Sequence, residues 1–125
     1  MPSSPDSDAL LHVLRRAVVA GVRSDGPDLT LRQLAALMRV YAGEGPATVK
    51  EVARDLSVAG PAVTRAYVRL EGLGYLRRRR GDGDRRSAVA GRTTGGTAAV
   101  AAIRARLAEA AAGLVARGTG QAPAA

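Results

Sequence analysis

Two short amphipathic segments joined by a tight turn constrain the fold of this 125-residue chain more than any other feature. Thr48 precedes the first segment and stands three residues before Glu51, which is the spacing of a helix-capping box. The turn, SVAG, leads to Pro61, and proline is tolerated in a helix only within the first turn. One face of the second segment collects its larger apolar side chains, namely Val63, Ala66, Tyr67, Leu70 and Leu73. Two helices joined in this way define a helix-turn-helix.

The opposite face of the second helix is mainly small, polar and basic, which suits entry into a DNA major groove. Its residues are Gly60, Ala62, Thr64, Arg65, Val68, Arg69 and Gly72. Because Ala59 and Gly60 precede the helix, we expect it to lack a side-chain cap, which typically costs about 1 kcal/mol. We expect Gly74 to end this helix.

An arginine-rich run, GYLRRRRGDGDRRS, follows directly. Tyr75 and Leu76 can begin a strand, GDGD has the residues of a turn, and RRSAVAGR can form a returning strand. Such a hairpin after a helix-turn-helix is a wing, whose arginines can clamp phosphates or enter a minor groove. Asp84 can hold a neighbouring arginine and accept turn amides, so we assign it a structural role. The alternative is a solvated loop with balancing charges.

The charge of the chain points to a polyanionic partner, either nucleic acid or an anionic membrane surface. The net charge is +8, and the segment from Arg77 to Arg92 contains seven arginines and two aspartates. Arginine forms forked contacts with phosphates and guanine, although the abundance of Arg, Ala and Gly also fits a high-GC coding bias. The sequence therefore favours double-stranded DNA as the partner.

The remaining composition argues against other classes of protein. There is no cysteine, so disulfides and thiolate metal sites are excluded. The start, MPSSPDSD, does not resemble a signal peptide, and the apolar stretches are too short to span a membrane, so we expect a cytoplasmic protein. His12 is the only histidine, and GRTTGGT lacks the lysine of a phosphate-binding loop. We therefore expect neither an enzyme nor a cofactor or metal site.

Three further helices are expected outside the helix-turn-helix. The first, within residues 9–23, is capped by Asp6 or Ser7. The second begins at the capping box of Thr30 and Gln33, and its apolar stripe is expected to be Leu31, Leu34, Met38 and Tyr41. The last carries an apolar seam at heptad-like spacing: Val100, Ile103, Leu107, Ala110 and Leu114.

The terminal helices are expected to form the core of a homodimer. The chain has no Phe or Trp, so its core is lean, and lean domains often share a core with a second copy. The residues assigned to dimerisation are Leu10, Leu14, Val18, Val100, Ile103, Leu107 and Leu114. A monomeric core built from the same helices is the alternative.

The ordered set of motifs resembles the MarR family of bacterial transcriptional regulators. The matching pieces lie between Leu29 and Gly96: LT..Q, TV.EVA..L, PAVTR…RLE.LGYL.R, DRR in the hairpin, and T…G before the last helix. The resemblance implies a mainly helical fold with a small β-hairpin wing, in which terminal helices form a dimer core. It also implies recognition of a palindrome and, for many members, a small aromatic effector.

Carried over residue by residue, the resemblance implies a set of functional side chains. The predicted DNA-binding residues are those that the resemblance implies and the other hairpin arginines, which we include. They are Ala62, Thr64, Arg65, Arg69, Arg79, Arg80, Arg85 and Arg86. Asp84 matches the wing aspartate, whereas Arg92 stands where an apolar residue is usual. We expect a dimerisation helix within residues 1–28, a DNA-binding domain over 29–93, a second dimerisation helix over 94–118 and a tail over 119–125.

The function predicted on these grounds is a sequence-specific DNA-binding regulator, a repressor that binds a palindromic operator as a dimer. The alternative is a winged helix that coats DNA without sequence preference or that binds another protein, because phosphate contacts supply affinity without sequence readout.

Overall fold

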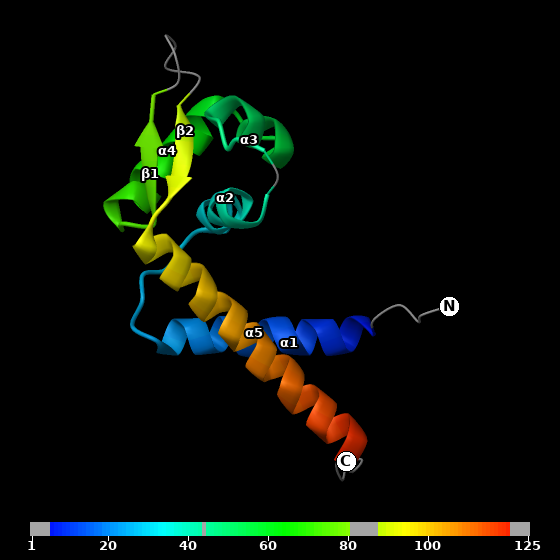
Figure 1. Cartoon of the computed structure of the whole chain (residues 1–125). Coiled ribbons are helices and arrows are strands. Elements are labelled where there is room, and N and C mark those ends of the chain that lie inside the picture. Colours follow the sequence, from blue (N-terminus) through cyan, green and yellow to red (C-terminus); the bar gives the residue numbers. More distant parts are fainter. Residues whose placement is uncertain (1–5, 44, 81–87, 121–125) are drawn as a thin grey trace. The chain divides into compact units, whose positions relative to one another are not determined.

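The computed structural model describes residues 6–43, 45–80 and 88–120, with side chains as far as Leu114. The described part contains five helices and one two-stranded antiparallel sheet (Figure 1). The elements in chain order are α1 (Ser7–Arg23), α2 (Leu31–Ala42), α3 (Val49–Leu56), α4 (Gly60–Gly72), β1 (Leu76–Arg79), β2 (Val89–Arg92) and α5 (Thr94–Gly120). The mainly helical architecture with a small hairpin is as predicted from the sequence.

The chain divides into two compact units. One unit, here called the lobe, is Leu29–Val100 and contains the helix-turn-helix and the hairpin. The other, here called the terminal unit, combines Met1–Asp28 with Ala101–Ala125.

Helix α4 is the centre of the lobe, because it packs against α2, α3 and β1. Its buried residues are Val63, Ala66, Tyr67 and Leu70, the apolar face that the sequence predicts. Tyr67 is fully buried and its hydroxyl donates a hydrogen bond of 2.8 Å to the carbonyl oxygen of Ala47. Burial raises the pKa of Tyr67 to about 12, so this phenol is neutral and a donor at physiological pH.

The apolar stripe predicted for α2 is wrong in phase. The buried residues of this helix are Ala36, Leu37 and Val40, whereas Leu31 is 83% and Met38 is 48% exposed. Tyr41, which the predicted stripe includes, does pack against the core. The face that packs inside the lobe is therefore centred on Leu37 and Val40, with Tyr41 at its edge, and not on Leu31 and Met38.

The helix starts agree with the capping pattern. At α2, Thr30 and Gln33 form both bonds of the capping box, at 3.1 and 3.0 Å. At α3, Thr48 accepts from the backbone N–H of Glu51 at 3.0 Å, but no return bond from Glu51 is formed between these two described residues. Asp6 caps α1 by accepting from the N–H of Asp8.

The turn between α3 and α4 has weak local support. Ser57 ends α3 in the left-handed region, with φ of 54°, a conformation that costs a non-glycine residue about 1 kcal/mol or more. Ala59 precedes α4 and makes no side-chain capping bond, as predicted. The turn is thus held by the burial of its two helices and by backbone bonds such as Val58 N–H to Ala53.

The hairpin is joined to the helical part of the lobe at its β2 edge. Strands β1 and β2 pair with Leu76 opposite Arg92 and Arg79 opposite Val89. On the other side of β2, the segment entering α3 adds two backbone bonds, from Val49 N–H to Ala88 and from Ala90 N–H to Ala47. The predicted return strand therefore forms, with the expected turn at GDGD lying outside the described residues.

The start of α5 is fixed within the lobe by Tyr41. The Tyr41 hydroxyl donates to the carbonyl of Tyr75 at 2.6 Å and accepts from the N–H of Thr93 at 3.0 Å. A β-carbon on Gly96 would overlap both that hydroxyl and the Tyr75 carbonyl. Glycine is therefore required here because α5 begins in direct backbone contact with the residue before β1.

The terminal unit contains α1 and the C-terminal part of α5. Ala17 and Ala110 are its buried residues among those whose side chains are described. Leu10, Leu14 and Val18 of α1 are each a little more than half exposed, and Leu107 of α5 is 37% exposed. In the described ranges no helix is long and apolar enough to span a membrane.

Replacing Ala59 with serine is expected to stabilise the lobe. The new hydroxyl would stand at the N-cap of α4, where the backbone is already extended, and would accept from a free N–H of the first turn. We expect the free energy of unfolding to rise by about 0.5–1 kcal/mol, measured by denaturant titration. Thr30→Ala is the converse control, expected to lower it by about 1 kcal/mol. An unchanged or lowered stability of Ala59→Ser, with the control behaving as expected, would show that the missing cap costs nothing.

Candidate nucleic-acid interface

The outward face of α4 presents a mixed polar and basic surface. Thr64, Arg65 and Arg69 are exposed, as is Val68, whereas Ala62 is half-buried. At 100° per residue, Ala62 and Thr64 lie at opposite edges of this face, with Arg65 between them. Thr64 lines a cleft on the hairpin side, so the face runs from the hairpin at Thr64 to Arg69 and Ala62 at the far edge.

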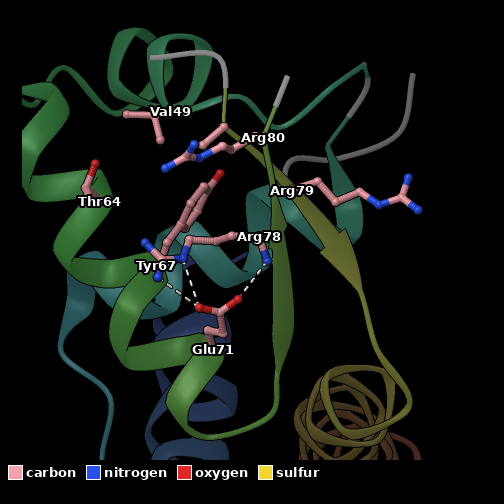
Figure 2. A pocket seen from close by; sticks show the side chains of 8 residues that line it. Val49, Thr64, Tyr67, Glu71, Arg78, Arg79 and Arg80 are labelled. Carbon is pink, nitrogen blue, oxygen red and sulfur yellow. Dashed lines mark hydrogen bonds and ion pairs between the residues drawn. The ribbon is translucent and has the colours of Figure 1, made fainter. Parts of the chain in front are cut away.

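The arginines of β1 are divided by the pleat of the strand. Leu76 is buried and Arg78, two residues later, lies on the same face and contacts α4. Arg77 and Arg79 alternate with them and therefore point to the opposite face of the hairpin. Figure 2 shows Arg80 over Tyr67 on the α4 side and Arg79 extending away from it. The predicted pair Arg79 and Arg80 thus reaches two sides of the hairpin.

A cleft of about 430 Å³ lies between α4, the start of α3 and the hairpin. The residues that line it are Val49, Thr64, Tyr67, Glu71, Arg78, Arg79, Arg80 and Ala88 (Figure 2). Its floor is the buried ring of Tyr67, and its rim holds the hydroxyl of Thr64 and the guanidinium of Arg80. This is the place in the described lobe where a basic side chain of the hairpin lies close to the recognition face of α4.

Glu71 of α4 binds Arg78 of β1 through three contacts (Figure 2). The Arg78 Nε donates to Glu71 Oε1 at 2.9 Å, the backbone N–H of Arg78 donates to Oε2 at 2.9 Å, and an Arg78 Nη atom lies 2.9 Å from Oε1. The hydrogen bond from the backbone N–H of Arg78 is the main reason that the pKa of Glu71 lies below its ordinary value, and the Arg78 side chain lowers it further. Glu71 is therefore ionised and bound to the hairpin.

Neither ion pair between described residues was predicted from the sequence. The second joins Arg39 of α2 to Asp55 of α3 at 2.6 Å. Both pairs connect different elements, and no fixed spacing signals them before the packing of those elements is known. Glu71 and Arg78 are the glutamate and the last arginine of the quoted LE.LGYL.R motif, but the motif alone does not show that the two side chains meet.

Arg92, which departs from the family pattern, packs against α2. Its guanidinium lies 5.6 Å from the centre of the Tyr41 ring, and its Nε donates to the Val40 carbonyl at 3.3 Å. A cation over an aromatic face replaces the apolar contact usual at this position. The remaining predicted hairpin residues, Asp84, Arg85 and Arg86, lie outside the described residues.

A helix-turn-helix followed by an arginine-bearing hairpin packed on its second helix defines a winged helix-turn-helix protein. Residues 28–87 match the model of the MarR family. The matched segment contains the helix-turn-helix, so the resemblance to that family read from the sequence is confirmed. A search of curated proteins gave no match.

Solved structures support the same assignment. The transcriptional regulator Tm0710 from Thermotoga maritima is 25% identical with a TM-score of 0.70, covering 93% of this chain and 78% of that one. S. aureus MepR bound to ethidium bromide is 25% identical with a TM-score of 0.66, covering 86% and 76%. RV1404 from Mycobacterium tuberculosis shares the fold at 24% identity, with a TM-score of 0.71 and coverage of 98% and 87%. The family match and these structures together support a DNA-binding transcriptional regulator of the MarR family.

The stability that Glu71 contributes is expected to depend on pH. A carboxyl group whose folded-state pKa is lowered stabilises the fold above its unfolded-state pKa, and that contribution is lost as the pH falls through the folded-state value. Because both partners are about one-third exposed, the contribution is at most about 1 kcal/mol.

Wild type and Glu71→Gln should therefore differ in unfolding free energy at pH 7, and the difference should shrink as the pH falls below the ordinary glutamate pKa and through the lowered folded-state pKa of Glu71. Denaturant titrations at several pH values measure this. A difference that persists unchanged at low pH would mean that the variant acts through shape and not through charge.

Proposed function

We propose that the chain binds a palindromic DNA operator as a homodimer and represses transcription. The observation that carries the proposal is the exposed polar and basic face of α4 beside a hairpin that carries arginines on both faces. Thr64, Arg65 and Arg69 would meet bases and phosphates in the major groove. Arg85 and Arg86, with Arg79 and Arg80, would bind phosphates or the adjacent minor groove, and Asp84 would orient its neighbours.

Dimerisation is the second part of the proposal. MarR-family regulators act as dimers, and α1 exposes Leu10, Leu14 and Val18 on one side, while Val100, Ile103, Leu107 and Leu114 recur along α5. A symmetric pair would present two α4 helices to half-sites about 34 Å apart. Sedimentation at micromolar concentration should show twice the 12.8 kDa chain mass, and a purely monomeric species would refute this part.

Sequence preference is the property that separates this proposal from non-specific coating. Selection from random duplexes should yield a two-fold symmetric site, and its affinity should exceed that for random duplex by about 10³-fold or more at physiological salt. A ratio near one would leave the chain as a non-specific DNA-binding protein.

Two arginine variants are expected to behave differently. Arg65→Ala should lower the affinity for the selected site by about 1–3 kcal/mol and relax its sequence preference. Arg80→Ala should weaken binding to all duplexes similarly and reduce the salt slope by about one. Arg104→Ala in α5 removes the same charge from the terminal unit and serves as the control, with little change expected. Equal losses on selected and random duplex for Arg65→Ala would contradict base readout by α4.

A small aromatic effector is the remaining partner that we propose, since the S. aureus MepR structure holds ethidium. An effector that binds the folded protein raises its unfolding temperature by mass action. Ethidium is the probe, added to the protein without DNA, and an unchanged unfolding temperature at saturating ethidium would remove this aromatic cation from consideration. We further propose that the chain acts in the cytoplasm, where bacterial DNA lies, and has no catalytic role.

A further inference from the structure

We propose that Glu71 and Arg78 form a positioning pair that holds the hairpin against α4 in the orientation that binds DNA. In this assignment Arg78 holds the hairpin to α4, whereas Arg77, Arg79 and Arg80 are exposed on the described part of the hairpin. The inference rests on the proposed function, because it concerns how the DNA-binding surface is assembled.

The contacts of Arg78 support this assignment. Its Nε and one Nη atom both lie 2.9 Å from the same carboxylate oxygen, so one edge of the guanidinium is occupied. Its backbone N–H is bound to the second oxygen at 2.9 Å. A phosphate would therefore have to compete with a carboxylate already fixed by three contacts.

The position of the pair on the hairpin explains why it is needed. The β2 edge is fixed by backbone bonds to Ala47 and Val49 at the entry of α3. On β1, the apolar contact with the core is made at Leu76, which is 2% exposed, and the next inward position is Arg78. Glu71 binds the backbone N–H of that residue and so fixes the β1 edge above the core. The hairpin is thereby held along both edges, which limits rotation about β2.

A purely electrostatic role and a positioning role for Glu71 predict opposite changes in DNA affinity when its charge is removed, which makes the assignment testable. Glu71 lines the cleft between α4 and the hairpin, near Thr64 and Arg80. If Glu71 acted only through its charge, removing that charge would favour a polyanion and tighten DNA binding. If it positions the hairpin, removing the charge weakens DNA binding even though the protein becomes more positive.

The first experiment compares Glu71→Gln with Glu51→Gln on the selected operator and on random duplex. Glu51 is an exposed carboxylate on α3, so the control loses the same charge from the same lobe. We expect Glu71→Gln to bind the operator about two- to fivefold more weakly, the range that an exposed ion pair can transmit. The control should bind equally or slightly more tightly. Tighter binding by both variants would overturn the proposal.

The second experiment reverses the pair. Glu71→Arg adds two positive charges and should nevertheless weaken operator binding, because it places two arginines together. Arg78→Glu should weaken it further. The double variant Glu71→Arg/Arg78→Glu keeps the net charge of +8 and restores the side-chain ion pair, so it should recover part of the loss. Recovery should be incomplete, because a guanidinium at position 71 cannot accept the backbone N–H of residue 78. A double variant no better than Arg78→Glu, or a Glu71→Arg variant that binds more tightly than wild type, would overturn the positioning role of the pair.

Folding and specificity are measured in parallel. Circular dichroism and denaturant unfolding show whether each variant is folded at the assay temperature, and the double variant tests the pair even if one single variant is unstable. Failure of wild type to prefer the selected operator refutes the proposed function. If wild type prefers the selected operator but Glu71→Gln binds that operator equally or more tightly, the positioning pair is refuted and the proposed function is not.

Discussion

The buried hydrogen bond from Tyr67 to Ala47 is the constraint on which the lobe depends. Tyr67 belongs to α4, the second helix of the helix-turn-helix, and Ala47 lies in the segment that leads into the first helix of the motif. The same carbonyl accepts the N–H of Ala90 from the hairpin. One oxygen therefore joins the recognition helix, the entry to α3 and β2. Because the phenol is fully buried, an alternative packing that left it without an acceptor would cost about 1–3 kcal/mol.

The arginine-rich run is organised by this arrangement and not only by its composition. Once β2 is fixed, the register with β1 determines which arginines face α4 and which face away. Arg78 faces α4 and meets a carboxylate, whereas Arg77 and Arg79 alternate to the other side. A sequence of four identical residues thus acquires different roles from its position in a pleated strand. The pleat and Glu71 thus determine which arginines of β1 are occupied inside the lobe and which are exposed.

Sequence reasoning predicted the elements well because their signals are local. Capping residues, Pro61 and the positive-φ Gly74 mark helix ends directly, and α4 has one clear apolar face. The phase predicted for α2 was wrong because the helix carries apolar residues on two faces, and the lobe buries Ala36, Leu37 and Val40 while Leu31 and Met38 stay exposed. The Glu71–Arg78 pair joins two elements through a turn, and although both residues lie in one sequence motif, their spacing alone does not show that the turn brings the side chains together. Local signals fix where helices begin, but tertiary contacts decide which side chains meet.

The core is made mainly of small apolar side chains, which explains why polar contacts fix the orientation of the elements in the lobe. Alanine, valine and leucine supply burial, but small apolar surfaces can be repacked with modest penalties and do not define one orientation. Directional bonds from two tyrosines do define one. Tyr67 fixes the recognition helix, and Tyr41 bonds to the carbonyl of Tyr75 and the N–H of Thr93, where the hairpin begins and ends. In a chain without Phe or Trp, the rings of Tyr41 and Tyr67 thus lie where elements meet, and both their apolar area and their hydrogen bonds contribute there.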